Sequence, residues 1–264
     1  MDNYTLDRQA PPLGGRVFLS LVCHDFKARY AGSALGGLWA LIQPVATVLL
    51  YWFVYRFAFA SGEAGGVPYV LWLICGIAPW FFFSDGLAAV TAAYTDYAFL
   101  VSKVRFRAYY LPVIRTASAL CRHLFFLLLV LLAGAVYGYV PQPANLLLAY
   151  YLVCTAVFLY AVGRITALLH VYLRDTGSVV QTVLQFGFWL TPIFWDAGNL
   201  PEAWQSAAQM TPIFYLVQGY RDAVLSSGTL TVYNALCFWG VCAVLLAFGA
   251  RQYRRVRPCL ADQL

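Results

Sequence analysis

The segment LFFLLLVLL, from Leu124 to Leu132, contains no polar side chain and is the most lipid-like part of the chain. It lies inside a longer apolar stretch, Ala117 to Tyr139, and a helix needs about 20 apolar residues to cross the hydrocarbon of a bilayer. Apolar residues make up 62% of the 264 residues, and charged residues only 11%. A water-soluble domain carries about 25% charged residues, so this composition predicts an integral membrane protein.

Five further stretches have the apolarity of a span, so we expect an all-α, polytopic membrane protein with six transmembrane helices. In chain order the six run from about Gly36 to Ala60, Val67 to Ala89, Ala117 to Tyr139, Ala144 to Leu168, Ser178 to Trp195 and Leu230 to Ala250. We expect residues 1–264 to form a single membrane domain. The first 35 residues hold no long apolar stretch, which predicts no cleavable signal peptide.

Along the chain, segments rich in lysine and arginine alternate with segments that hold neither residue. The residues before the first span, the second connection and the residues after the sixth span are basic, whereas the first and third connections hold no lysine or arginine. By the positive-inside rule, we expect both termini and the even-numbered connections to face the cytoplasm. The basic clusters are therefore interpreted as topology signals, and no nucleic-acid partner is expected.

Residues 16–34 are predicted to form an amphipathic helix in the cytoplasmic interface. Apolar side chains recur there at helical spacing, and most charged residues fall elsewhere on the helical wheel. The apolar positions are Phe18, Leu21, Val22, Phe26 and Tyr30. A leader segment with no specific role is the alternative interpretation.

Residues 196–227 are too polar to span a bilayer and too aromatic for a solvated loop. Backbone groups at membrane depth must be satisfied by protein or water, so we expect two short re-entrant helices at the outer face. The candidate outer-gate residues are Trp204, Tyr215, Tyr220 and Arg221. An ordinary exposed charge pair, which contributes little, is the alternative for Arg221 and Asp222.

Several catalytic and nucleotide-binding motifs are absent from the sequence. Neither lysine, Lys27 nor Lys103, follows a glycine run, so the chain has no phosphate-binding loop. The sequence also lacks HExxH, GxSxG and paired-cysteine patterns. We therefore expect no cofactor and no metal site in this chain. If ATP drives the protein, ATP and Mg²⁺ bind to a separate subunit.

Charged and histidine side chains also occur within the apolar stretches. Arg56, Arg122 and Arg164 are interpreted as arginines near membrane edges that reach the interface. No acid lies near the centre of a span, which disfavours an ion-coupled pump. His123 and His170 are expected to face each other at the cytoplasmic ends of the third and fourth spans, with packing favoured over a haem or metal site.

Aromatic residues recur along three of the predicted spans. Tyr51, Tyr55 and Phe59 lie four residues apart in the first span. Lipid contact and helix packing account for many such residues, but an aromatic wall can also stack on the apolar faces of sugar rings. The candidate path residues are Tyr51, Trp52, Tyr55, Phe59, Trp80, Phe83, Phe186 and Trp189.

Five blocks of the sequence, in order, resemble the membrane subunits of type-2 ABC exporters of O-antigen, capsular polysaccharide and teichoic acid. The first block, His24 to Phe57, reads HDFKARYAGSALGGLWALIQPVATVLLYWFVYRF and resembles the family's entry into its first span. The second, Tyr69 to Asp85, reads YVLWLICGIAPWFFFSD and is similar to the family's second span. The remaining blocks are 97–112, 189–195 and 211–222. The chain departs from the family pattern at Arg107, where proline is common, and at Thr211, where asparagine is common.

The resemblance implies a homodimer that works with two copies of a separate ATP-binding cassette subunit. It implies export of a lipid-linked polysaccharide across the bacterial inner membrane, where the chain contacts membrane lipids. It leaves open whether a periplasmic or outer-membrane export partner exists. It also implies a cytoplasmic coupling helix within 97–112 that docks on the ATPase. The residues carried over are Lys103, Arg105, Phe106 and Arg107 for ATPase coupling, and Lys27 and Arg29 for the carrier phosphate, with contact to anionic lipid alone as the alternative for the basic ones.

Two other classes of function remain open at this stage. An ABC exporter of a small drug or lipid shares the architecture and differs only in substrate. A membrane-embedded transferase enzyme needs clustered acids or a His–acid pair at one interface. Asp85 and Asp175 are the only acids near the cytoplasmic ends of the core spans, which gives the enzyme thin support.

Overall fold

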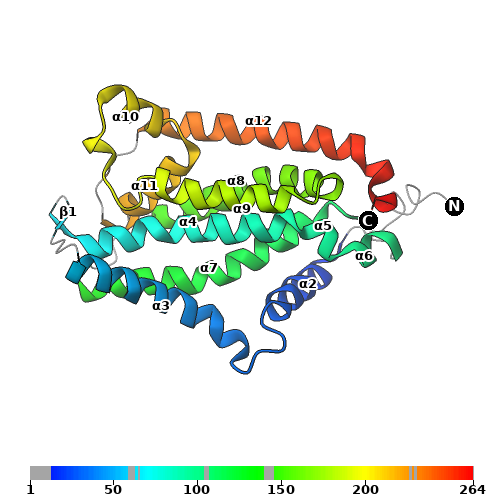
Figure 1. The fold of residues 1–264 in the computed structure, drawn as a ribbon, viewed down its shortest axis with the longest axis horizontal. Helices are drawn as coiled ribbons and strands as arrows, with labels where there is room; N and C mark the ends of the chain where they lie inside the picture. Colours follow the sequence, from blue (N-terminus) through cyan, green and yellow to red (C-terminus); the bar gives the residue numbers. More distant parts are fainter. Residues whose placement is uncertain are drawn as a thin grey trace.

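The computed structural model describes residues 13–58, 63–64, 66–103, 107–139, 146–225, 228 and 231–263. These residues form an elongated helical bundle (Figure 1). One end of the bundle, here called the α2 end, carries α2 (Gly15–Ala28), α5 (Ala93–Asp96), α6 (Ala98–Lys103) and η5 (Arg257–Asp262). The other end, here called the α10 end, carries β1 (Glu63–Ala64) and α10 (Glu202–Gln209).

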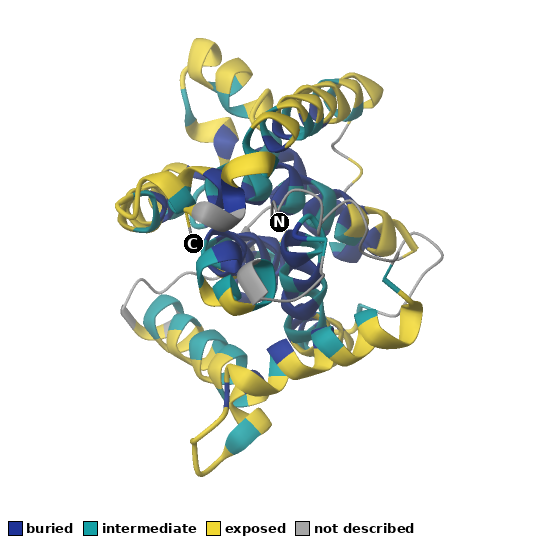
Figure 2. Ribbon diagram, turned by 90° about the vertical axis from the view of Figure 1, so that its right-hand side faces the viewer, coloured by how far each residue is buried: buried dark blue, intermediate teal, exposed yellow. Residues whose placement is uncertain are grey.

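Helix α4 (Tyr69–Thr91) is the centre of the bundle. It packs against α7 (Tyr110–Val136), α8 (Leu146–Tyr172) and α11 (Pro212–Leu225), and also against α9 (Thr176–Leu190). Small residues let α4 and α8 approach closely, because a Cβ atom at Gly163 would lie 2.5 Å from Val90. Seen along the bundle, buried residues gather in the centre and the outer helices are largely exposed (Figure 2).

Five helical segments among the described residues are long and apolar enough to cross a membrane. They are Gly36–Phe53, Tyr69–Thr91, Tyr110–Val136, Leu146–Tyr172 and Val232–Leu260. The first joins η1 (Gly36–Leu38) to α3 (Trp39–Phe53), and the last joins α12 (Val232–Val256) to η5. The prediction of a polytopic, largely helical membrane protein is therefore confirmed.

The segment expected to be the fifth of six spans is shorter than predicted. Helix α9 ends at Leu190, where Ser178 to Trp195 had been expected to span. Thr191 is extended, with φ −77° and ψ 138°, because the residue before a proline is driven out of the helical region. The 15 residues of α9 give a helix about 22 Å long, which is shorter than the roughly 30 Å thickness of a bilayer's hydrocarbon.

The third span begins seven residues earlier than Ala117, where it had been expected. Pro112 lies in the first turn of α7, where its missing N–H and fixed φ are tolerated. Arg115 had been assigned to the loop before the span because of its charge. Within α7 its guanidinium is paired with two carboxylates, so the charge is stabilised there. The charge that had marked a loop is therefore part of the helix.

Two local features were not expected from the sequence. The chain continues past α3 as a π-helical turn, η2 (Val54–Ala58), and β1 pairs antiparallel with β2 (Val67–Pro68) in a two-residue hairpin. The hairpin is the one departure from an all-α fold in the part of the chain that the structure describes. It joins the first two spans at the α10 end (Figure 1).

Helix α2 is amphipathic, as its spacing predicted. Val22 is buried in a small apolar cluster, and Phe18 and Leu21 pack against it. This face lies against α7. The helix ends at Ala28, before residue 34, so Tyr30 is buried outside it. The cluster at the α2 end is separate from the main core around α4, so the bundle has one large core and a smaller one beside α2.

The segment 196–225 contains η4 (Ala197–Asn199) followed by α10 and α11. Helix α10 has no buried residue. In α11, every residue from Phe214 to Val224 is buried except Gln218, which is half-buried. Helix α11 lies among α4, α8 and α12. The two helices therefore have opposite environments: α10 on the surface and α11 in the core.

Candidate functional site

A groove of about 490 Å³ lies between α3, α4 and α9. Its walls combine aromatic rings with hydroxyl, amide and carboxylate groups, although all three helices belong to the apolar bundle. The aromatic lining residues are Tyr51, Phe81, Phe188 and Trp189, and the polar ones are Ser84, Asp85, Gln181, Thr182 and Gln185. A groove of this composition offers flat apolar surfaces and hydrogen-bonding groups side by side.

The periodicity of α9 places its polar side chains on the groove. Gln181 and Gln185 are four residues apart and so share one face of the helix. Val180 and Leu184, which precede each of them, are buried in the main core. The helix therefore packs through its valine and leucine and presents its amides to the groove.

A glycine allows α9 to approach α4 closely. A Cβ atom at Gly187 would lie 2.8 Å from Cη2 of Trp80, closer than real Cβ contacts allow. The indole of Trp80 is itself buried, with 5% of its surface exposed. Gly187 therefore determines how closely α9 packs against α4.

Phe188 is the centre of the aromatic wall. Its ring contacts rings from α3, from α4 and from the turn after α9, so three parts of the chain meet at this side chain. Its ring centroid lies 4.9 Å from Phe194, 6.0 Å from Trp80, 6.2 Å from Phe81 and 6.4 Å from Tyr51. These separations are those of packed aromatic pairs.

Asp85 is exposed in the single chain, although it lies within a spanning helix. It is six residues from the end of α4, or about 9 Å along the helix axis. A carboxylate facing lipid is costly, and such residues in membrane proteins face the bundle interior or a water-filled space. Its place on the groove wall therefore indicates that the groove is hydrated and does not face lipid.

The structure divides the predicted path residues into three sets. Tyr51 and Trp189 line the groove, and Tyr55 stacks beside it on Phe194, with a centroid distance of 5.8 Å. Trp80 and Phe83 are buried in the core behind the groove. Trp52 and Phe186 are exposed and do not line it, and Phe59 lies outside the described residues.

Sequence reasoning missed most of the polar side of the groove. Ser84, Gln181, Thr182 and Gln185 were not among the candidates, and Asp85 was interpreted only as a residue near a membrane edge. A signal was present, because Ser178, Gln181 and Gln185 form a polar stripe at helical spacing in an otherwise apolar stretch. Such a stripe in a predicted span indicates a face that avoids lipid.

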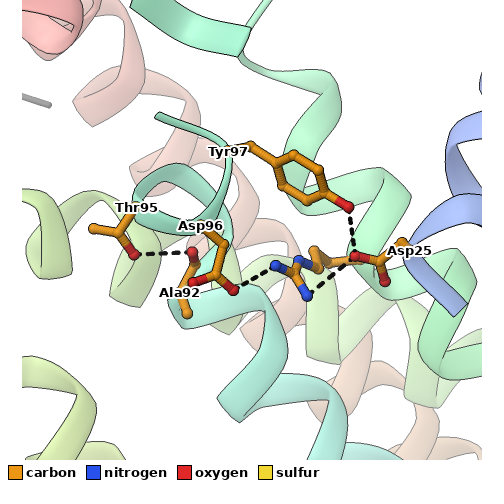
Figure 3. A network of polar contacts seen from close by, with 6 residues as sticks. Asp25, Ala92, Thr95, Asp96 and Tyr97 are labelled. Carbon is orange, nitrogen blue, oxygen red and sulfur yellow. Dashed lines mark hydrogen bonds and ion pairs between the residues drawn. The ribbon is translucent and has the colours of Figure 1, made fainter. Parts of the chain in front are cut away.

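A network of charged groups joins three elements at the α2 end (Figure 3). Arg115 on α7 lies with Nη1 3.1 Å from Oδ1 of Asp25 on α2, and its other terminal nitrogen pairs with Asp96 on α5. The hydroxyl of Tyr97 donates to Asp25 over 2.8 Å. Burial, with the hydrogen bond to Asp25, raises the pKa of the Tyr97 phenol to about 12, so it stays a donor at neutral pH. The network holds α2 against the start of the 97–112 region.

The predicted coupling region begins as the short helix α6, which lies against η5 near the C-terminus. Arg107 is half-buried just before α7. Arg105, Phe106 and the side chain of Lys103 lie outside the described residues. Lys27 and Arg29, predicted for the carrier phosphate, are both exposed, and Arg29 lines a second cavity.

Arg221 is buried, so the alternative of an exposed Arg221–Asp222 pair is wrong. Its guanidinium donates to the carbonyl of Pro192 and to that of Ile193, each over 2.9 Å, and lies 3.4 Å from the ring centroid of Trp72. Burial lowers its pKa to about 9, so it remains a cation at neutral pH. Arg221 thereby ties α11 to α4 and to the turn after α9.

The other predicted gate residues lie in two environments. Trp204 is on exposed α10, whereas Tyr215 and Tyr220 are in the core. The hydroxyl of Tyr220 is 2.9 Å from Nε2 of His123, whose ring stacks on Phe82 at 4.6 Å. These contacts fix α11 against α7 and α4.

The expectation that His123 and His170 face each other is wrong. His123 is buried beside Tyr220, whereas His170 lies against Gly177 near the start of α9. Helix α7 begins at Tyr110, so His123 lies at the middle of the helix and not at its end. Among the described residues, no group of three His, Cys, Asp or Glu side chains is arranged to hold a metal ion.

Comparison with known protein families places this arrangement. The family model of the ABC-2 type transporter matches residues 16–225, which include α2, the groove and α11. The chain belongs to the ABC-2 type transporter family. It is thus a transport component, and the resemblance seen in its sequence motifs is confirmed.

Three curated relatives are similar to most of this chain. The chain is 29% identical to the O-antigen export system permease protein RfbA of Myxococcus xanthus over 208 residues, 78% of each chain. It is 23% identical to the protein of the same name from Klebsiella pneumoniae over 247 residues, 91% of this chain and 92% of the relative. A second Klebsiella pneumoniae relative of that name is 23% identical over 207 residues.

Proposed function

We propose that this chain is the membrane subunit of an ATP-driven exporter that moves a lipid-linked polysaccharide outward across the bacterial inner membrane. The O-antigen export function in the names of the relatives supports a glycan as cargo. Membership of a transporter family favours transport over the alternative of an embedded transferase.

The composition of the groove is the single observation that carries the proposal. Sugar rings have apolar C–H faces that stack on aromatic rings, and hydroxyls that exchange hydrogen bonds with amides and water. The groove offers both, with Phe188 and Trp189 on one side and Gln181 and Gln185 on the other. This composition favours a glycan over an apolar drug or lipid, because an apolar ligand would leave the glutamine amides without hydrogen-bond partners.

The groove is open along one side, which supports a homodimer. Two of the helices that form its walls also carry exposed apolar residues, Leu50 and Phe53 on α3, and Val183 and Phe186 on α9. Only 6% of the span that contains α3 is buried within the chain. A second copy packed against these faces would enclose a continuous path between two grooves.

The distribution of arginine supports the proposed orientation, with the α2 end in the cytoplasm. Arg29, Arg115 and Arg174 lie at this end, as do the arginines after residue 250. At the α10 end, the arginine whose side chain the structure describes is Arg221, which is buried. By the positive-inside rule, this distribution supports a cytoplasmic position for both termini. Helix α9 with the turn after it then makes the sixth crossing.

We assign the 97–112 region to the contact with a separate ATP-binding cassette subunit, two copies of which would bind ATP and Mg²⁺. Lys103, Arg105, Phe106 and Arg107 are the proposed contact residues. The Asp25–Arg115–Asp96 network offers a path by which movement of this region reaches α2. At the other end, α10 with Trp204 would cap the exit and offer a surface to an outer-membrane partner.

The test uses the amides of the groove. The double variant Gln181→Leu, Gln185→Leu keeps side-chain size and removes two hydrogen-bonding groups, each worth about 0.5–1.5 kcal/mol. We expect surface glycan in a complemented deletion strain to fall about tenfold. Gln252→Leu is the matched control, because Gln252 lies on α12 and does not line the groove.

Co-purification with the ATPase subunit is measured in the same strains. It should persist in the double variant, because the substitutions are far from the 97–112 region in the sequence and lie on another helix. Normal surface glycan in a well-expressed double variant would contradict a role of the groove in export.

A further inference from the structure

A second cavity, of about 480 Å³, lies between the residues that follow α2 and the helices α3, α4 and α7. Its polar lining includes two guanidinium groups and one carboxylate, and the rest is largely aromatic and apolar. The charged residues are Arg29, Asp85 and Arg122, and the rings include Trp39, Phe81 and Phe82. The cavity shares Phe81 and Asp85 with the groove, but Arg122 has no role in the proposed export path.

Arg122 is the unusual residue of the cavity. One terminal nitrogen of its guanidinium is buried and has no hydrogen-bond partner among the described residues. Its charge interacts with those of Arg29 and Asp85, but the ion pairs found in the described part of the chain are both made by Arg115. A buried donor on a charged group that lacks a partner costs at least about 1–3 kcal/mol. Such a cost is tolerated where a ligand supplies the missing acceptor.

The cavity runs from the α2 end of the bundle toward its middle, where Arg122 lies 12 residues, or about 18 Å, into α7. Arg29 and Tyr30 directly follow α2, which lies at the α2 end of the bundle. Asp85 is about 9 Å from the end of α4 at the same end. A ligand could therefore reach Arg122 from the interface with its polar group first and its apolar part toward the rings.

The charges select the class of ligand. Two arginines and one aspartate leave one net positive charge, which disfavours a cation and favours an anion. The guanidinium fork matches a phosphate in geometry and charge. The aromatic walls, at membrane depth, favour an anion that carries a hydrocarbon chain over a free inorganic one.

We propose that this cavity binds the phosphate group of a membrane lipid, with Arg122 as its buried partner, Arg29 at its mouth and Asp85 as the counter-charge that faces Arg122 when the cavity is empty. Asp85 and Phe81 line both this cavity and the groove, so a phosphate held here lies directly beside the groove. In taking the lipid to be the carrier of the cargo, the inference rests on the proposed function. The assignment replaces Lys27, which does not line the cavity, with Arg122.

Binding can be measured on the purified full-length protein in detergent, without ATPase or transport. The probes are a radiolabelled long-chain isoprenoid phosphate, the corresponding uncharged isoprenoid alcohol, and phosphatidylglycerol. We expect Arg122→Met to weaken binding of the isoprenoid phosphate at least about tenfold, equivalent to about 1.4 kcal/mol. Binding of the alcohol should not change, since it lacks the phosphate.

Three further variants separate phosphate binding from a structural role. Arg122→Lys should restore part of the affinity, because it keeps the charge and loses the fork. Asp85→Asn should raise the affinity, because it removes a negative charge next to the phosphate. Arg164→Met is the matched control: Arg164 also lies in a span, but it packs on the Tyr160 ring at 5.4 Å, outside the cavity.

The outcomes distinguish failure of this inference from failure of the proposed function. Loss of isoprenoid phosphate binding in Arg122→Met supports both the site and the carrier. Loss confined to phosphatidylglycerol supports the site and contradicts its role in holding the cargo carrier. Unchanged binding of both the isoprenoid phosphate and phosphatidylglycerol to a folded Arg122→Met protein overturns the site. It leaves the proposed role of the groove in export untouched.

Discussion

Helices α3 and α4 are both apolar enough to span a membrane, yet they differ in what surrounds them. In α4, 78% of the best spanning window is buried by the rest of the chain, whereas in the span that contains α3 the share is 6%. Helix α4 has neighbours on all sides, and α3 lies mainly against α7 at the edge of the bundle. Figure 2 shows the same contrast between a buried centre and exposed outer helices.

This difference shows that hydropathy reports a preference for lipid over water but not for protein over lipid. The apolar side chains of α4 satisfy this preference within the chain, through close packing. Those of α3 remain available to lipid or to a second copy of the chain. Helix association in membranes depends on packing, because lipid tails are as apolar as leucine. Substitutions in the two helices should therefore have different effects.

The largest expected effect is that of Leu73→Ala on α4. Leu73 is fully buried, so removing its side chain leaves a cavity and should lower the free energy of unfolding by about 3 kcal/mol. Leu50→Ala on α3 is the matched substitution, since Leu50 is 60% exposed, and it should change the stability of the single chain by less than about 0.5 kcal/mol. SDS-induced unfolding of the purified variants measures both.

Equal losses of stability in the two leucine variants would show that α3 is enclosed as fully as α4 in the purified protein. If the proposed homodimer forms through α3, Leu50→Ala should instead lower the dimer fraction seen by size-exclusion chromatography with light scattering. The pair thus separates packing within the chain from packing between chains.

A smaller effect is expected from Gly187→Ala, at the contact between α9 and the centre of the bundle. The added methyl would meet Trp80 at 2.8 Å, so α9 must shift and stability should fall by about 2 kcal/mol. Gly240→Ala on α12 is the control, because its Cβ would meet nothing within 4 Å. The control should be neutral or stabilising by up to about 1 kcal/mol, since alanine favours helix. A stable Gly187→Ala protein with full export would count against a close contact between α9 and Trp80.

The smallest expected effect is that of Tyr97→Phe at the α2 end. The variant loses the 2.8 Å hydrogen bond to Asp25 and keeps the ring beside Arg115, so stability should fall by about 1 kcal/mol. The pKa of Tyr97 is raised in the folded protein, so the stability this raised pKa provides is present below the ordinary phenol pKa and is lost as the pH rises toward about 12. Between pH 6 and 8, the difference between Tyr97→Phe and the parent should therefore be constant. A marked dependence on pH in that range would place the controlling titration elsewhere in the network.

The membrane-spanning character of the chain could be predicted from its sequence for direct physical reasons. Long apolar runs such as Leu124 to Leu132 have no other favourable solvent, and the alternation of basic segments follows from the cost of moving arginine across a membrane. The amphipathic spacing of α2 could also be predicted, because the period of apolar residues is a local property of the sequence. Ordered motifs from His24 to Asp222 also indicated the family, which the match to residues 16–225 confirms.

The tertiary structure alone decided which helix faces meet. Asp85 and Arg122 lie 37 positions apart on different helices and line one cavity, and Arg221 meets carbonyls that precede it by 28 and 29 positions. Neither could be read from the chain, because a charged residue in an apolar stretch gives no indication of the helix that will compensate it. Burial depends on how helices from distant parts of the sequence cross, and this is why α3 and α4, so alike in composition, are surrounded so differently.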